Sequence, residues 1–343
     1  MNLKELSKKL GLSQTTVSRA LNGYPEVNKE TRDRVLIAAE QHNYRANTRA
    51  KSLATGKSMS IGHVIPMATK HEMMNPVFAD FIAGAGETYA RAGYEMVISV
   101  VDDVNEERVY RAFKSRGTVD GVILHGPKLN DARLTLLDEI GLPYAVHGRA
   151  TGYAHDYCWL DVNNRSAFRR ATDFLLDLGH RRIALINGLE FMDFAVRRRS
   201  GFSDALQARG IGIAPELMRS DEMTEAFGYE CMHQMLQHDD PPTAVLVSSM
   251  ICALGVRRAI EETGRVMGRD ISVITHDDAL SYLQNGGTIP IFTATRSSVR
   301  DAGRQLAQML LNQISEPFAP LKTVLLDAEL IAGSSTGPAP TII

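Results

Sequence analysis

The first 45 residues space apolar and polar positions as three short helices do. The leucines from Leu3 to Leu10 share one helical face, and Gly11 follows them, as expected at a helix C-terminus. A second helix begins near Ser13 and ends before Asn22-Gly23, and Asn28 can cap a third. Two short helices around a tight glycine turn predict a helix-turn-helix unit, whose second helix enters the DNA major groove.

From residue 58 the pattern changes to an alternation of strands and helices. Predicted strands cover residues 61–65, 94–101, 119–124, 144–146, 183–186, 244–248 and 271–275. Predicted helices cover residues 77–93, 106–116, 165–178, 199–209 and 254–263. Such alternation predicts an α/β fold with doubly wound parallel sheets, here in two lobes.

Charge is divided unevenly along the chain. Residues 1–57 carry eleven Lys or Arg against five Asp or Glu, and the remaining residues carry 27 against 35. A basic head on an acidic body predicts a polyanionic partner for the head, because bound phosphates release their counterions. A merely solvated basic surface is the alternative reading of charge alone.

The outward face of the second helix consists of hydrogen-bonding side chains without an acid. These are Gln14, Thr15, Thr16, Ser18 and Arg19, with Asn22 near the end. Gln can pair with adenine and Arg with guanine, so Gln14 and Thr15 are predicted to read bases. Ser13, Asn28 and Thr31, at the starts of the second and third helices, are also expected DNA contacts. An exposed helix face is polar in any protein, so the polar face alone does not indicate DNA binding. The helix caps, the glycine turn and the basic charge of the head together support that interpretation.

Four segments of the head resemble the headpiece of the LacI/GalR repressor family: residues 12–23, 27–32, 43–47 and 49–57. The resemblance makes residues 1–45 a DNA-binding headpiece and residues 46–57 a hinge helix that links it to a sensor. It implies that Asn47, Arg49, Ala50 and Leu53 contact DNA, with Leu53 wedged into the minor groove. A plain basic linker is the alternative. So short a segment is marginal as an isolated helix, so its folding would depend on the DNA and on a partner hinge.

Residues 58–343 resemble the family's sensor, which is similar to periplasmic sugar-binding proteins. The matching segments are 75–78, 121–124, 178–184, 198–202, 270–274, 276–278 and 334–337. The resemblance assigns residues 58–159 and 290–320 to one lobe, and residues 160–289 and 321–337 to the other.

Open α/β sheets bind ligands beyond the carboxyl ends of their strands, so polar residues that follow strands are candidates. These candidates are His147, Arg149, Asn187, Ser249 and Asp277. The resemblance adds Arg198 as a contact to sugar hydroxyls, Asp277 as the acidic contact and Phe78 as part of the cleft wall. Trp159, Phe191 and Phe194 could form an apolar platform for a sugar ring, or they could simply pack in the core.

Two positions depart from the family pattern. Ser249-Met250 replaces a common Asn-Asp pair, and Gly148 stands where many members have Asp. Both changes remove bulk or charge, which suggests a roomier cleft. The sensor resembles the subgroup that responds to α-glucosides, so a disaccharide such as sucrose, maltose or trehalose is the expected effector.

Other function classes find little support in the sequence. An enzyme is the main alternative, but no phosphate-binding loop or nucleophile elbow occurs. A transport receptor would need a signal peptide, which the charged N-terminus does not resemble. The spacing of Cys158, Cys231 and Cys252 indicates neither disulfides nor a zinc site, so we expect no catalytic residues, metal or cofactor.

The expected assembly is a cytoplasmic homodimer without membrane contact, placed on a pseudo-palindromic operator. The tail from residue 338 is too short for a tetramerising helix. Sugar is expected to release the operator. The sequence leaves open the opposite sign, in which the ligand strengthens DNA binding.

Overall fold

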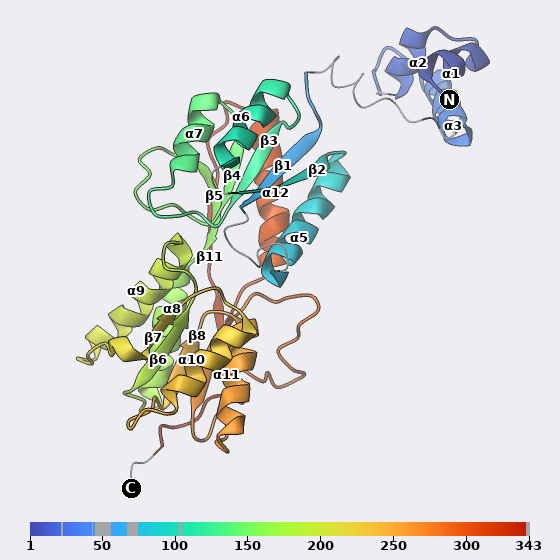
Figure 1. Cartoon of the computed structure of the whole chain (residues 1–343). Coiled ribbons are helices and arrows are strands. Elements are labelled where there is room, and N and C mark those ends of the chain that lie inside the picture. The colour runs from blue at the N-terminus through green and yellow to red at the C-terminus, as the bar shows by residue number, and fades with distance from the viewer. Residues whose placement is uncertain (22, 43, 45–55, 67–74, 103–104, 341–343) are drawn as a thin grey trace. The chain divides into compact units, whose positions relative to one another are not determined.

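The computed structural model describes residues 1–340 except 22, 43, 45–55, 67–74 and 103–104 (Figure 1). The chain separates into two compact units, Met1–Met59 and Ser60–Ile343. None of the described helices combines the length and apolar character that a membrane crossing requires.

The first unit contains the helices α1 (Leu3–Leu10), α2 (Gln14–Leu21) and α3 (Lys29–Gln41), as the sequence predicts. Each begins at a hydrogen-bonded cap. Asn2 and Glu5 form a capping box, the Ser13 hydroxyl accepts from the Thr16 amide at 3.0 Å, and Asn28 accepts from the Thr31 amide at 2.8 Å. The helices pack around a small apolar core made of Leu6, Val17, Ala20, Val27, Val35 and Ala39.

The first sheet of the second unit has six described strands in the order β11-β5-β4-β3-β1-β2, all paired in parallel. They are β1 (Ser60–Pro66), β2 (Glu95–Val101), β3 (Gly121–His125), β4 (Tyr144–His147), β5 (Cys158–Val162) and β11 (Thr323–Leu326). The helices packed on this sheet are α5 (Pro76–Ala92), α6 (Glu106–Arg116), α7 (Ala132–Ile140) and α12 (Val299–Ser315). Helices α5 and α12 pack together over one core, and α6 and α7 over another, so the sheet is covered on both faces.

The second sheet has six described strands in the order β12-β10-β9-β8-β6-β7, and only the β10–β12 pair is antiparallel. They are β6 (Ile183–Asn187), β7 (Met218–Ser220), β8 (Ala244–Val247), β9 (Ser272–Asp277), β10 (Thr293–Arg296) and β12 (Glu329–Ile331). The helices α8 (Asn164–Asp177) and α9 (Asp193–Ala208) pack together, as do α10 (Glu225–Met235) and α11 (Met250–Glu262). The predicted pair of doubly wound parallel sheets is therefore confirmed.

The chain passes between the two lobes at residues that differ from those we expected. Strand β10 lies within residues 290–320 but belongs to the second sheet, and β11 lies within 321–337 but belongs to the first. Strand pairing decides the assignment, because β10 pairs with β9 and β11 pairs with β5. The crossings therefore fall between β5 and α8, between β10 and α12, and between β11 and β12.

Helix α9 begins earlier than predicted. The apolar pattern suggested a start near Arg199, whereas the helix starts at Asp193. Its first turns therefore carry Phe194 and Arg198, two of the residues expected at the ligand site.

Candidate functional site

The exposed face of α2 carries the side chains predicted to read DNA. Gln14, Thr15 and Arg19 are exposed, whereas Val17 and Ala20 are buried in the core. Thr16 and Ser18 are half-buried. A short capped helix with an exposed polar face fits the major groove by its N-terminal residues.

Two expected DNA contacts, Ser13 and Asn28, also serve as helix caps. The Ser13 hydroxyl accepts from the Thr16 amide and lies 2.8 Å from the Thr16 hydroxyl, while Asn28 caps α3 at the Thr31 amide. Loss of these side chains would therefore affect folding as well as DNA contact. The expected contacts Asn22, Asn47, Arg49, Ala50 and Leu53 lie outside the described residues.

A cavity of about 470 Å³ lies between the two lobes of the second unit. Residues from both lobes line it, at the carboxyl ends of β3, β4, β6, β8 and β9. This is the place where open parallel sheets bind ligands. The predicted residues that line it are Phe78, His147, Phe194, Arg198 and Ser249.

Arg198 presents a buried cation to this cavity. Its Nε donates to Asn164 Oδ1 at 2.7 Å and one terminal nitrogen donates to the Ser248 carbonyl at 2.6 Å. The guanidinium lies 5.0 Å from the ring centroids of both Phe168 and Phe194. Among the described residues no carboxylate oxygen is within 4.0 Å of it, and burial lowers the pKa of Arg198 to about 10. The side chain stays protonated near neutral pH and has further N–H groups for a ligand hydroxyl.

Of the two adjacent acids at the end of β9, Asp278 lines the cavity and Asp277 does not, which corrects our prediction of Asp277. Asp161, Asp221, Glu222 and Glu225 line the cavity as well. Asp277 is buried outside the lining, where its Oδ1 accepts from the Ala279 amide at 2.8 Å. His276 and Asp278 line the cavity instead, because successive side chains of an extended segment point to opposite sides. Burial raises the pKa of Asp278, but the charge and hydrogen bond of His276, with help from Arg198, outweigh it and hold the pKa below its usual value.

Histidines and aromatic rings form the wall contributed by the first lobe. His125 and His147 line the cavity, and the ring of Phe81 stacks on His147 with a centroid distance of 4.2 Å. His125 also meets the edges of Phe78 and Phe81, each at 5.0 Å. Burial lowers the pKa of His147 to about 4 and that of His125 well below its usual value, so both rings are neutral near pH 7.

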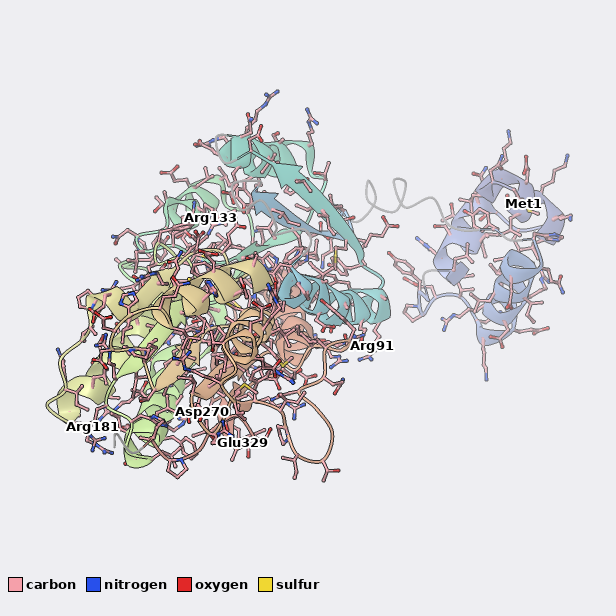
Figure 2. The ribbon with its side chains drawn as sticks, turned by 60° about the horizontal axis from the view of Figure 1, so that its bottom comes forward. Met1, Arg91, Arg133, Arg181, Asp270 and Glu329 are labelled. Carbon is pink, nitrogen blue, oxygen red and sulfur yellow. The ribbon has the colours of Figure 1, made fainter. Side chains whose placement is uncertain are left out.

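Arg133 holds the loop that follows β3 at the cavity. One terminal nitrogen donates to the carbonyls of His125 and Gly126 at 3.2 Å each. The same side chain pairs with Asp131 at 2.6 Å and with Glu106 at 3.1 Å. In Figure 2, Arg133 lies in the first lobe. The labelled residues Arg181, Asp270 and Glu329 lie in the second lobe, at its end away from the first lobe. Sequence patterns gave no sign of this buried support.

The other predicted ligand residues lie outside the cavity lining. Arg149 donates to Asp161 at 2.8 Å and stacks on Trp159 at 5.0 Å. Asp161 itself lines the cavity, so Arg149 and Trp159 lie behind Asp161 and do not face the cavity. These two residues therefore support the site rather than face it.

Asn187 and Phe191 are also outside the lining. Asn187 is fully buried, accepts from the Ser248 hydroxyl at 2.7 Å and donates to the Ala195 carbonyl at 2.9 Å. It therefore fixes the loop after β8 against α9. Phe191 is 49% exposed, and the Lys128 ammonium lies 5.8 Å from its ring.

Gly148 lines the cavity, and the backbone conformation at this position favours glycine. Its φ is +109°, and a Cβ there would lie 2.8 Å from Pro127 Cδ. Glycine is the residue that accepts such a φ without strain. The absence of an Asp at this position thus follows from the backbone conformation, in addition to any room that it leaves.

Two family descriptions match the chain. Residues 2–47 match "Bacterial regulatory proteins, lacI family", and residues 172–336 match "Periplasmic binding protein-like domain". These two matches correspond to the helix-turn-helix unit and to part of the cavity-bearing unit.

Relatives and solved structures agree along nearly the whole chain. The HTH-type transcriptional regulator AglR of Rhizobium meliloti (strain 1021) is 44% identical over 99% of this chain and 95% of AglR. RafR of Escherichia coli, also an HTH-type transcriptional regulator, is 30% identical over 92% of each chain. A transcriptional regulator CelR–cellobiose complex has a TM-score of 0.72 at 26% identity, covering 98% of this chain and 99% of that one. The lac repressor bound to ONPG in the repressed state has a TM-score of 0.81 at 25% identity, with the same coverage. The chain therefore belongs to the LacI family of bacterial regulatory proteins, and it is a DNA-binding transcriptional regulator rather than an enzyme.

Proposed function

We propose that this regulator represses carbohydrate genes and leaves its operator when a disaccharide of the α-glucoside class fills the cavity between the lobes. Sucrose, maltose and trehalose are the leading candidates. The observation that carries the proposal is the composition of the cavity wall. It combines a buried cation, Arg198, with an acid, Asp278, and the aromatic rings of Phe78 and Phe194.

This composition suits a sugar. Hydroxyl groups both donate and accept, so a guanidinium and a carboxylate on one cavity can hold neighbouring hydroxyls of one ring. Aromatic faces suit the C–H side of a pyranose. The volume of about 470 Å³ lies within the range of roughly 300–1,000 Å³ common for small-molecule sites. The CelR structure named above is a cellobiose complex, which supports a disaccharide.

The regulator acts as a homodimer in this proposal. Strand β2 is at the edge of the first sheet, and Ile98 and Val100 on it are 43% and 44% exposed. Exposed edge strands with apolar side chains are normally covered in soluble proteins, and a second copy would cover this one. Two subunits would place two headpieces on a pseudo-palindromic operator. Since the operator is chromosomal DNA, the dimer would act in the cytoplasm and without a membrane.

The proposed link between sensor and headpiece is residues 46–57. An isolated segment of this length is marginal as a helix in water, so it would fold only on the duplex and against the partner's copy. Leu53→Ala is then expected to weaken operator binding more than non-specific binding, measured by gel shift against a scrambled site. Equal losses on both DNAs would reduce this segment to a linker.

Calorimetric titration with mono- and disaccharides, followed by gel shift with the DNA upstream of the gene, tests the proposal. A disaccharide that binds and releases the DNA is the expected result. A sugar that binds and tightens the DNA complex would establish the corepressor alternative. Turnover of any sugar would contradict the proposal that the sugar acts as an effector.

A further inference from the structure

A short segment of the second lobe is anchored in the first lobe. Residues 278–283, here called the strap, follow β9 and precede the return of the chain to β10 in the same sheet. Leu280 is 3% exposed and belongs to the core of the first lobe, where its cluster includes Phe81 and Leu306. Leu283 packs against the cores of both lobes. The strap therefore joins the lobes by packing, apart from the three crossings of the chain.

A buried carboxylate fixes the strap to α5. Asp80 is 4% exposed, and its Oδ2 accepts from the Ser281 amide at 2.6 Å. The Ser281 hydroxyl donates to Asp80 Oδ1, and Arg300 of α12 lies 3.5 Å from the same oxygen. Hydrogen bonds to a buried ionised group are stronger than those between neutral groups, and removing such an acceptor leaves the donors unsatisfied. The Asp80 carboxylate thus holds the strap with both of its oxygens.

The other end of the strap is at the cavity. Asp278 lines the cavity and is three residues before Ser281. Between them, Ala279 adopts a φ of +52°, and its amide donates to Asp277. A non-glycine residue in this conformation persists only where its surroundings determine it. Here the surroundings are the hydrogen bond to Asp277 on one side and the Leu280–Asp80 anchor on the other.

We infer that Asp80 and Ser281 are positioning residues of the sensor: they hold the strap so that Asp278 faces the cavity, and they transmit a displacement of Asp278 to α5 and α12. The chain between cavity and anchor is too short to absorb a movement of Asp278 by slack. A ligand that draws Asp278 toward itself therefore pulls on α5 through Ser281. This coupling rests on the proposed function, whereas the anchoring of the strap does not.

Amide hydrogen exchange over residues 277–283 in the full-length protein without sugar tests the anchor. We expect exchange at least about tenfold faster in Asp80→Asn and Ser281→Ala than in the wild type, because opening of the strap loses its charged acceptor or one of its donors. Ser281→Thr keeps the hydroxyl and should restore most of the protection. Asp301→Asn is the matched control: Asp301 of α12 accepts from Arg304 and should leave the strap unchanged. Wild-type exchange in both Asp80→Asn and Ser281→Ala would overturn the inference.

The coupling is measured as the ratio of operator dissociation constants with and without saturating maltose, sucrose or trehalose. In Asp80→Asn and Ser281→Ala we expect this ratio to fall at least about fivefold toward one, while Asp301→Asn and Ser281→Thr keep it. If Asp80 and Ser281 only stabilise the fold, their variants will have a lower melting temperature and an unaltered ratio. That result would contradict the proposed transmission from Asp278 to α5 and α12. If none of the three sugars binds the wild type, the proposed ligand class is wrong, and the exchange result alone decides whether Asp80 positions the strap.

Discussion

His63 and His125 share a hydrogen bond of 2.9 Å between Nδ1 of the first ring and Nε2 of the second. His125 lines the cavity, whereas His63 is fully buried in β1 and lies 3.2 Å from the Tyr89 hydroxyl through its other nitrogen. A chain of polar contacts thus runs from the cavity wall through β1 to α5. One ring must donate and the other accept, so the bond requires at least one neutral imidazole.

Because of these buried histidines, we predict that the free energy of unfolding falls on acidification. Burial lowers the pKa of His63 to about 3, that of His147 to about 4 and that of His125 well below 6.5. Between pH 6.5 and about 4 the unfolded chain binds protons that the folded protein does not. Their contribution is therefore complete above pH 6.5 and is lost as the pH falls. Each histidine should lower the free energy of unfolding by about 1.4 kcal/mol per pH unit in that window.

Urea unfolding at pH 7.5, 6 and 5 checks this prediction. His63→Phe should flatten the pH dependence by about one histidine's share, because one buried titrating group is gone. His155, which is exposed, provides the matched control as His155→Gln, with no change of slope expected. A slope as steep in His63→Phe as in the wild type would show that other groups cause the acid sensitivity.

Replacement of Arg198 should remove the ligand response and leave DNA binding. Arg198→Ala deletes two charge-assisted hydrogen bonds, to Asn164 and to the Ser248 carbonyl, as well as the cavity cation. We expect the affinity for the effector to fall by about 3 kcal/mol, roughly 100-fold, measured by calorimetry. Arg199→Ala is the control, since Arg199 is half-exposed and pairs with Glu190. Wild-type sugar affinity in Arg198→Ala would rule out this cavity as the effector site.

A methyl group at Gly148 should destabilise the protein. The φ of +109° and the contact of 2.8 Å with Pro127 both oppose a Cβ at this position. We expect Gly148→Ala to lower the free energy of unfolding by about 1–3 kcal/mol, measured by urea titration. A Cβ at Gly212 would meet nothing within 4 Å, so Gly212→Ala should be neutral or slightly stabilising. Equal effects of the two substitutions would refute the backbone explanation.

On the DNA side, Arg19→Ala and Gln14→Ala should reduce discrimination between operator and random DNA. Both side chains are exposed on α2, and each well-placed base contact contributes about 1–3 kcal/mol of discrimination. Lys29→Ala, which also removes a headpiece charge, should weaken both DNAs alike if Lys29 contacts only phosphate. The measurement is a gel shift titration on matched duplexes. Unchanged discrimination in Arg19→Ala would place base reading elsewhere.

The periodicity of apolar residues was sufficient to predict most of the fold. Helix α2 and strand β9 were predicted within two residues of their bounds, because a cap or a buried apolar run marks each. Helices α7, α10 and α12 were not predicted. The apolar residues of α7 and α10 are scattered around the helix rather than gathered in a stripe.

Whether a candidate residue lines the cavity could be predicted where a single element carries it, but not where the direction of the side chain decides. Arg198 and His147 were identified and line the cavity. Asp277 was chosen over Asp278 because a sequence gives the end of a strand but not which of two adjacent acids faces inward. Asp80 was missed because its partner Ser281 is 201 residues away in the sequence. Arg133 was missed although His125 is only eight residues before it, because the contact depends on how the loop between β3 and α7 folds.

The two lobes cannot be separated at any one peptide bond. Each lobe combines two stretches of sequence, because the chain crosses after β5, after β10 and after β11. The unit Met1–Met59, by contrast, is continuous. Exchange of genetic segments between related regulators can therefore give a sensor a new operator specificity in a single recombination step, while a hybrid of two sensors that joins a lobe from each would need three matched junctions.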